Sequence, residues 1–158
     1  MTYTTSIDKI VRNKTIGAFI LFTIIPLSNL FRNDNWIFYL CIYAIFMLIM
    51  LWAFLHKPIS YEVDHNKVTV RRPIGNIQIN LQTVKRIDRI HHDLLKNVLR
   101  GGAFGYFGKF DTDLGKTTWY GTRRDNLVVF TKHDNSKIVL TPDQCDVFVE
   151  GLNKSQSH

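Results

Sequence analysis

Four arginines, in two adjacent pairs, are the residues best suited to hold a ligand: Arg71 with Arg72, and Arg123 with Arg124. Each pair borders a short run in which apolar and polar residues alternate, so we expect both pairs at strand ends. A guanidinium group stays charged, and its planar fork can hold a phosphate through two hydrogen bonds. If the pairs converge, they would bind an anionic group such as a lipid headgroup. The alternative is a scattered, solvated basic surface without a ligand.

A second candidate is a run of glycines and aromatic residues. Glycines stand at positions 101, 102, 105 and 108, among Phe104, Tyr106, Phe107 and Phe110. This spacing matches neither GxGxxG nor the phosphate-loop pattern, so nucleotide binding is disfavoured. We expect a structural loop with unusual φ values, whose aromatic rings pack on the sheet. The alternative is that Phe104, Tyr106 and Phe107 contact membrane lipid or a partner.

Acidic residues and histidines form no catalytic or metal-binding pattern. Adjacent side chains of His91-His92-Asp93 point apart, and no second cluster completes a set of four ligands. Asp111 and Asp113 could pair as acid and base, but no nucleophile accompanies them, and a solvated turn explains both. We therefore predict no enzyme activity, no metal site and no cofactor.

Two uncharged stretches near the N-terminus are long enough to form membrane spans. Residues 15–31 include Pro26, and residues 36–55 suffice to cross the ~30 Å hydrocarbon core as a helix. Only residues 32–35 separate them, so we expect an antiparallel transmembrane hairpin. A signal peptide is the alternative for the first stretch, but no small-x-small cleavage site precedes Arg32. A buried core helix is the alternative for the second, and it would need a core larger than this chain can build.

The charges of the flanking segments predict the orientation of the hairpin. The net charge of the chain is +7, of which residues 1–14 carry +2 and the residues from 57 onward carry +5. Because basic flanks stay in the cytoplasm, we predict a multi-pass protein of the inner (cytoplasmic) membrane with both termini cytoplasmic. Anionic lipids suit this basic balance better than nucleic acid, which we do not expect as a partner. Cys41 and Cys145 lie in different segments, so no disulfide is expected.

From residue 59 onward the apolar residues alternate with polar ones, as in β-strands. Strands are expected at about 59–64, 67–71, 76–81, 84–90, 116–120, 127–131 and 137–141. A short helical or irregular piece would follow the fourth strand, up to residue 99. The apolar stripe of residues 144–152 predicts a final helix, which Thr141 or Asp143 can cap and in whose first turn Pro142 fits.

Several sequence blocks resemble a bacterial pleckstrin-homology (PH) domain family over about residues 59–152. They are GGAFGYFGKF at 101–110, WYGTR at 119–123, NLVVFT at 126–131 and TPD at 141–143. The resemblance implies an α+β protein in which a PH-like β-barrel of about seven strands is capped by the C-terminal helix. It brings no catalytic residues. Members of this family commonly follow one or more membrane spans.

The chain is thus expected to comprise a cytoplasmic tail (1–14), a two-helix transmembrane hairpin (15–56), a PH-like domain (57–154) and a disordered end (155–158). We predict a membrane-anchored interaction or scaffold module that binds a protein partner or anionic lipid headgroups. The alternative is an accessory subunit of a membrane enzyme or transporter complex. The hairpin could also pair with other spans, including those of a second copy in a homo-oligomer.

Overall fold

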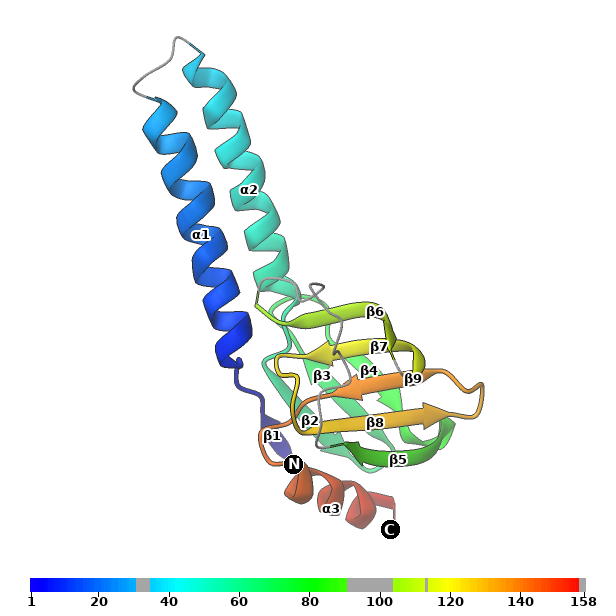
Figure 1. Cartoon of the computed structure of the whole chain (residues 1–158). Coiled ribbons are helices and arrows are strands. Elements are labelled where there is room, and N and C mark those ends of the chain that lie inside the picture. The colour runs from blue at the N-terminus through cyan, green and yellow to red at the C-terminus, as the bar shows by residue number, and fades with distance from the viewer. Residues whose placement is uncertain (31–34, 91–103, 113, 157–158) are drawn as a thin grey trace.

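A hairpin of two long helices stands on a β-rich domain (Figure 1). The computed structural model describes the chain except for residues 31–34, 91–103, 113 and 157–158. Helix α1 (Lys9–Leu30) packs along α2 (Trp36–His56), and both are long and apolar enough to cross a membrane. Most of their large apolar side chains are exposed, so neither is the buried core helix of a soluble domain. The predicted helical hairpin is confirmed.

Helix α1 begins at Lys9, well before the expected residue 15, because Asp8 caps it. The backbone N–H of Val11 donates to Asp8 Oδ1 at 2.6 Å, and that of Arg12 donates to the Asp8 carbonyl at 3.0 Å. The first turns of α1 are therefore polar and basic. Farther along, the Phe22 ring stacks on Phe46 of α2 with centroids 4.5 Å apart.

The first sheet is antiparallel and has the order β1-β2-β3-β4. Its strands are β1 (Thr2–Thr4), β2 (Ser60–Asp64), β3 (Lys67–Arg71) and β4 (Ile77–Asn80). The predicted turn between β2 and β3 is present, with Asp64 opposite Lys67. Strand β1 consists of residues that we expected in an N-terminal tail. It pairs with β2, although the entire helical hairpin lies between the two strands in the sequence.

The second sheet has the order β5-β8-β9-β7-β6. Its strands are β5 (Val84–Ile90), β6 (Tyr106–Thr112), β7 (Gly115–Gly121), β8 (Leu127–Lys132) and β9 (Lys137–Leu140). Strands β7 and β9 run parallel, and the other pairs are antiparallel. The strand predicted at 84–90 is confirmed, whereas the piece expected up to residue 99 lies outside the described residues.

The strands form two sheets rather than the single closed barrel that we expected. The 3₁₀ turn η1 (Leu81–Thr83) carries the chain from β4 to β5, and each of these strands is an edge of its own sheet. Two described strands, β1 and β6, exceed the expected number. Neither has the regular alternation of apolar residues by which the other strands were found, because β1 is mostly polar and β6 contains Gly108.

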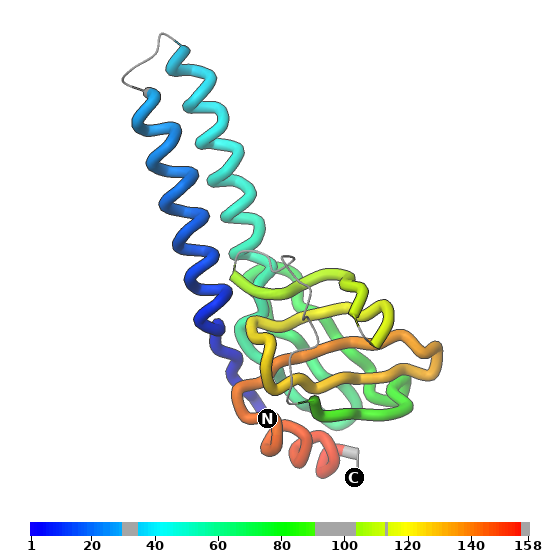
Figure 2. Tube along the Cα trace, viewed as in Figure 1, coloured from blue at the N-terminus to red at the C-terminus, as the bar shows by residue number. Residues whose placement is uncertain are grey.

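The main core lies between the two sheets and helix α3 (Cys145–Gln156), as expected for a PH-like domain. Tyr61, Val70, Phe130, Leu140 and Phe148 are all fully buried there. A second apolar cluster, which includes Trp119 and Val139 together with Val11 of α1, lies on the other face of the five-stranded sheet. The central strands of that sheet are therefore apolar on both faces. Both termini lie at the end of the domain away from the hairpin tip (Figure 2).

Candidate functional site

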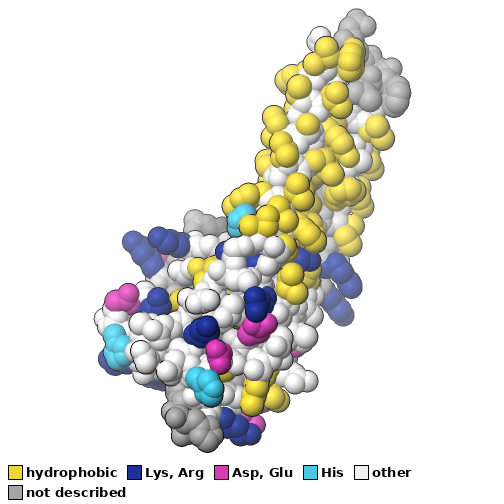
Figure 3. Space-filling view, turned by 180° about the vertical axis from the view of Figure 1, so that it is seen from behind, with side chains coloured by type: hydrophobic (Ala, Val, Ile, Leu, Met, Phe, Trp, Pro, Cys, Tyr) yellow, Lys and Arg dark blue, Asp and Glu magenta, His cyan; other side chains and the backbone are white. Residues whose placement is uncertain are grey.

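The C-terminal end of α2 is joined directly to the domain. The backbone N–H of Ile74, in the turn between β3 and β4, donates to the Leu55 carbonyl at 3.1 Å. The Lys57 ammonium lies 4.3 Å from the centre of the Phe54 ring, a cation–π contact. Ile59 and Ile74 remain about half exposed beside this helix end. Hydrophobic side chains thus continue from the hairpin onto the near face of the domain (Figure 3).

The described part of the glycine-rich block packs against both helices of the hairpin. Phe104 adopts a φ of 66°, and its N–H donates to Thr15 Oγ1 of α1 at 3.0 Å. Its ring meets Phe54 of α2 edge to face, with centroids 5.6 Å apart. At Gly105 a Cβ would lie 2.8 Å from the Gly121 carbonyl oxygen, so this close approach requires glycine.

The aromatic residues of the block divide between two environments. The Phe107 ring lies 6.3 Å from the Trp52 ring between centroids, at the base of the hairpin. Tyr106 points to the opposite face of the strand, where it is fully buried against Trp119. The block is therefore not only a loop, because Tyr106 starts β6. Of the three aromatic candidates, Phe104 and Phe107 lie at the hairpin and Tyr106 lies in the second core cluster.

The first arginine pair lies at the end of β3. Arg71 forms an ion pair with Glu62 across the sheet, with 2.8 Å between nitrogen and oxygen, and this hydrogen bond holds the pKa of Glu62 below its usual value. Arg72 folds back on its own turn, where its Nε donates to the Gly75 carbonyl at 2.7 Å. This turn is the one bonded to Leu55, so the pair lies beside the end of α2.

The second arginine pair lies between β7 and β8, next to the start of α1. Arg123 forms ion pairs with Asp125 at 2.8 Å and with Asp143 at 3.4 Å. Arg124 lines a shallow surface pocket of about 500 Å³ together with Asp8 and Lys9 of the α1 start. The two pairs thus belong to different elements. Basic side chains lie on either side of the hairpin base in Figure 3.

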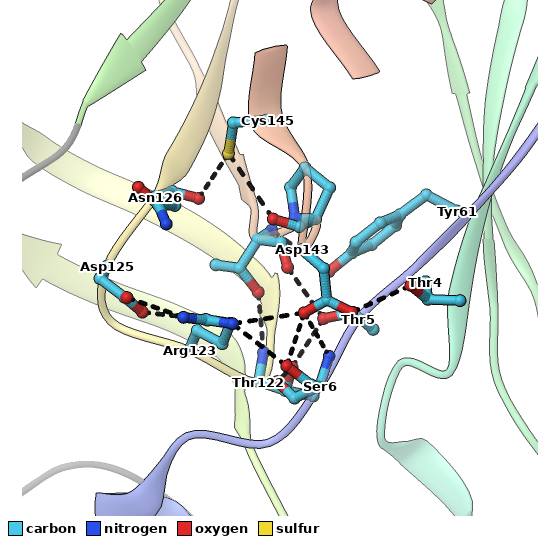
Figure 4. Close-up of polar contacts among 12 residues, drawn as sticks. Thr4, Thr5, Ser6, Tyr61, Thr122, Arg123, Asp125, Asn126, Asp143 and Cys145 are labelled. Atoms are coloured by element: carbon cyan, nitrogen blue, oxygen red, sulfur yellow. Dashed lines mark hydrogen bonds and ion pairs between the residues drawn. The ribbon is translucent and has the colours of Figure 1, made fainter. Parts of the chain in front are cut away.

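Asp143 is the centre of a polar cluster that holds the N-terminal segment (Figure 4). Its Oδ1 accepts hydrogen bonds from the Ser6 backbone N–H at 2.9 Å and from Ser6 Oγ at 2.5 Å. Its Oδ2 accepts from Thr4 Oγ1 at 2.9 Å. The Asp143 N–H in turn donates to the Thr4 carbonyl at 3.0 Å. The TPD block, expected to cap the final helix, therefore binds residues from the other end of the chain.

Threonine hydroxyls extend this cluster into the domain. Thr5 Oγ1 donates to the Thr141 carbonyl at 2.8 Å and lies 2.7 Å from Thr122 Oγ1. The Thr122 hydroxyl donates to the Ser6 carbonyl at 2.7 Å, and the Thr122 N–H donates to Thr141 Oγ1 at 2.9 Å. Thr122 and Thr141 are nearly fully buried, so their hydroxyls need these partners. The WYGTR and TPD blocks meet at this point.

The charges of the cluster stabilise one another. Partial burial by itself would raise the pKa of Asp143, but hydrogen bonds from Ser6, Thr4 and Arg123 outweigh it and hold this pKa below its ordinary value. A hydrogen bond to Asp125 is the main reason why the pKa of Arg123 is raised. The same bond lowers the pKa of Asp125. The carboxylates and the guanidinium are therefore charged at neutral pH.

Cys145 does not have the environment of a nucleophile. Burial, with a smaller contribution from Asp146, raises the pKa of its thiol to about 11, so the thiol stays protonated at neutral pH. Its Sγ donates to the Asn126 carbonyl at 2.9 Å. Within the described ranges, no group of three or more His, Cys, Asp or Glu residues could hold a metal ion. The His91-His92-Asp93 run and Asp113 lie outside those ranges, and Asp111 is exposed on β6.

The residues at the N-terminal side of this cluster, Thr4, Thr5 and Ser6, were not predicted from the sequence. A signal was present, because TYTT combines residues favoured in strands and stands just before the helix-capping Asp8. The partners of these residues are more than 110 positions away in the sequence. No local pattern could show such a pairing.

Comparison with known proteins assigns the family. A family model described as a bacterial PH domain matches residues 59–156, which is more than half of the chain. No curated protein and no solved structure matches the chain. The match covers β2 to α3, including the blocks that meet at Asp143, and it leaves out the hairpin and β1. This chain belongs to the bacterial PH domain family.

Proposed function

We propose that this protein is a membrane-anchored, non-catalytic scaffold whose PH domain binds a protein partner at the cytoplasmic face. The hairpin would cross the inner membrane twice, with both ends in the cytoplasm. PH domains are generally interaction modules rather than enzymes, and the protonated, buried thiol of Cys145 agrees with that role.

One observation carries the proposal: the domain is attached to the hairpin at three separate places. The N-terminal segment joins α1 to the Asp143 cluster, Ile74 bonds the end of α2, and Phe104 bonds Thr15 of α1. A flexible stalk would let the domain sample many orientations. Attachment at three places instead presents the same surface toward the cytoplasm at a constant height above the membrane, as a scaffold requires.

The charge distribution supports the orientation. Lys9, Arg12 and Lys14 lie in the first turns of α1, and Lys57 follows the end of α2, so cations flank both helices on the side of the domain. Each basic residue near an anionic leaflet contributes about 1 kcal/mol of attraction. Headgroup contact at this face would hold the domain in place, and lipid binding need not be the main function of the domain.

Protein binding can be tested by photo-crosslinking of the full chain in its native membrane. Gln78 and Lys109 are exposed on β4 and β6, which are edge strands among the strands that the structure describes. A free strand edge can accept a strand of another protein. A photoreactive residue at either site should give a discrete adduct with a protein. The same residue at Leu48, a lipid-facing position of α2, serves as the control and should give lipid adducts. Only lipid adducts at every exposed site of the domain would refute the proposal.

Headgroup binding has its own test. The full chain would be placed in nanodiscs of neutral or of anionic lipid, and hydrogen exchange of the turn at residues 72–76 would be compared. Slower exchange in anionic lipid, lost in Lys57→Gln/Arg72→Gln, would show headgroup contact. Equal exchange in both lipids would remove the lipid role and leave the protein partner.

A second candidate function is that of an accessory subunit in a membrane complex. A mostly apolar cavity of about 270 Å³ opens between α1 and α2 near Pro26, and most of the large apolar side chains of the hairpin are exposed. Side chains of a further transmembrane helix, from another protein or from a second copy, could fill this cavity. Disulfide trapping between Leu40→Cys positions of two copies would show self-association, and its absence in native membranes would leave a different protein as the occupant.

A further inference from the structure

We infer that the edge of β2, with α3 and the TPD segment, is a binding groove for an extended peptide segment. The chain fills this groove with its own residues 1–6, and we infer that this segment behaves as a dissociable ligand. The inference concerns the domain alone, and it holds whether or not the hairpin crosses a membrane.

The occupant comes from outside the family domain. The family match begins at residue 59, so the matched region leaves the outer edge of β2 without a neighbouring strand. Residues 2–4 add that strand antiparallel, with Tyr3 opposite Tyr61. The ladder continues through Met1, whose nitrogen donates to the Val63 carbonyl at 2.8 Å while the Val63 N–H donates back to Met1 at 2.8 Å. This is the main-chain geometry of peptide recognition by strand addition.

Contacts with α3 select the side chain at the third position. The Tyr3 ring lies edge-on to Phe148, with centroids 5.0 Å apart and planes at 87°. A Cβ on Gly151 would overlap the Tyr3 hydroxyl. Glycine inside a helix costs about 1 kcal/mol relative to alanine. The close approach of Tyr3 gives a reason for glycine at this position.

Hydroxyl groups define the rest of the segment. Thr4 and Ser6 bind the Asp143 carboxylate, and Thr5 binds the buried Thr122 and Thr141. The side chains of the groove therefore recognise an aromatic residue followed by three hydroxyl residues. A methyl group in place of the Thr5 hydroxyl would remove the hydrogen bond to the carbonyl of the buried Thr141.

The segment is held mainly by polar contacts at the surface. Thr2, Thr4 and Ser6 are exposed, and Tyr3 and Thr5 are only partly buried. Only Ile7 and Asp8 separate it from α1, and the Asp8 N–H donates to the Thr122 carbonyl at 3.2 Å. Occupancy of the groove thus couples the first turn of α1 to the domain. Release would expose the β2 edge, while Ile74 and Phe104 would keep the domain attached to the hairpin.

The test uses the full chain in detergent and a labelled synthetic peptide of residues 1–8. A variant that lacks residues 2–6 should bind the peptide saturably in fluorescence anisotropy. The intact chain should bind at least about tenfold more weakly, because its own segment occupies the groove. A peptide with Tyr3→Ala and the deletion variant that also carries Gly151→Val are the matched controls, and both should lose binding.

Equal peptide binding by the intact chain and the deletion variant would overturn the inference, as would no binding to a deletion variant that still melts cooperatively. If the deletion variant does not fold, Gly151→Ala in the full chain decides the question. This change favours the helix itself, so faster hydrogen exchange at Ser6 and Val63 would support displacement of the segment. Unchanged exchange there would overturn the inference.

Discussion

At the scale of single residues, the Asp143 carboxylate ties the N-terminal segment to the domain. Asp143 follows a proline before the final helix, which is the usual place of a capping residue. In the structure its two carboxylate oxygens bind Thr4, Ser6 and Arg123 instead. The helix prediction is confirmed, whereas the partner of the carboxylate could not be read from neighbouring residues.

Replacement of Asp143 by asparagine should lower the free energy of unfolding by about 1–3 kcal/mol, because several hydrogen bonds to a charged acceptor are weakened. Thermal melting of the purified chain, followed by tryptophan fluorescence, measures this. Asp64→Asn is the matched control: its ion pair with Lys67 spans 3.9 Å at the surface, so little change is expected. Equal melting of the two variants would contradict the role of Asp143.

The same variant should change the acid sensitivity of the protein. The pKa of Asp143 is lowered in the folded state, so its stabilising contribution is present above the unfolded pKa of about 3.9. It is lost as the pH falls through the lower folded pKa. Asp143→Asn should therefore show a smaller loss of stability between neutral and strongly acid pH than the wild type. An identical pH profile would show that this carboxylate is not linked to folding.

The thiol of Cys145 gives a second prediction. Because its pKa is raised to about 11, only a minute fraction is thiolate at pH 7.5, and maleimide labelling of the folded chain should be very slow. Labelling in denaturant should be complete within minutes. The Cys41→Ser background leaves Cys145 as the one thiol that can be labelled, and mass spectrometry measures the labelled fraction. Fast labelling of the folded protein would contradict the buried position and would reopen the question of a reactive cysteine.

The arginines show a general limit of residue-level prediction. A sequence shows which residues are charged but not which acidic side chains pair with which arginines. The four arginines therefore suggested a site for an external anion. In the structure Arg71 pairs with Glu62, and Arg123 pairs with Asp125 and Asp143. Their role as ligand-binding residues stays a prediction.

At the scale of elements, the two strands that the sequence did not reveal, β1 and β6, each lie next to one of the three attachments between the domain and the hairpin. Strand β1 is polar, short and remote from its partner in the sequence. Strand β6 is interrupted by Gly108, so its period is hidden. Helices α1 and α2 and most other strands were predictable, because each carries its own periodic or continuous apolar pattern. No local sequence pattern indicates which distant segments pair with each other.

Gly105 tests the close approach of the glycine-rich block to the end of β7. Gly105→Ala should destabilise the domain by about 1–3 kcal/mol, because its Cβ would meet the Gly121 carbonyl at 2.8 Å. Gly17→Ala is the matched control, since a Cβ there meets no atom within 4 Å and alanine favours the helix. Melting temperatures of the two variants measure the difference. A Gly105→Ala variant as stable as Gly17→Ala would mean that the close approach does not form.

At the scale of the whole molecule, the sequence predicted a hairpin followed by a PH domain and did not predict how tightly the two are joined. Charge segregation and hydropathy are sums over whole segments, so the hairpin can be predicted from them without knowledge of the fold. The three attachments depend on single atoms: a Leu55 carbonyl, a Thr15 hydroxyl and the Asp143 carboxylate. Because β1 precedes α1 and β2 follows α2, their pairing requires that both ends of the hairpin lie on the same side as the domain.

The predicted topology, with both ends of the hairpin and the domain on the cytoplasmic side, is tested most directly by locating three single cysteines relative to the membrane. In a Cys41→Ser/Cys145→Ser background, Thr2→Cys, Asn35→Cys and Lys109→Cys place a thiol in β1, near the hairpin turn and in the domain. A membrane-impermeant maleimide should label Asn35→Cys in intact spheroplasts, and the other two only after permeabilisation. Labelling of Thr2→Cys or Lys109→Cys in intact spheroplasts, or of Asn35→Cys only after permeabilisation, would contradict the account.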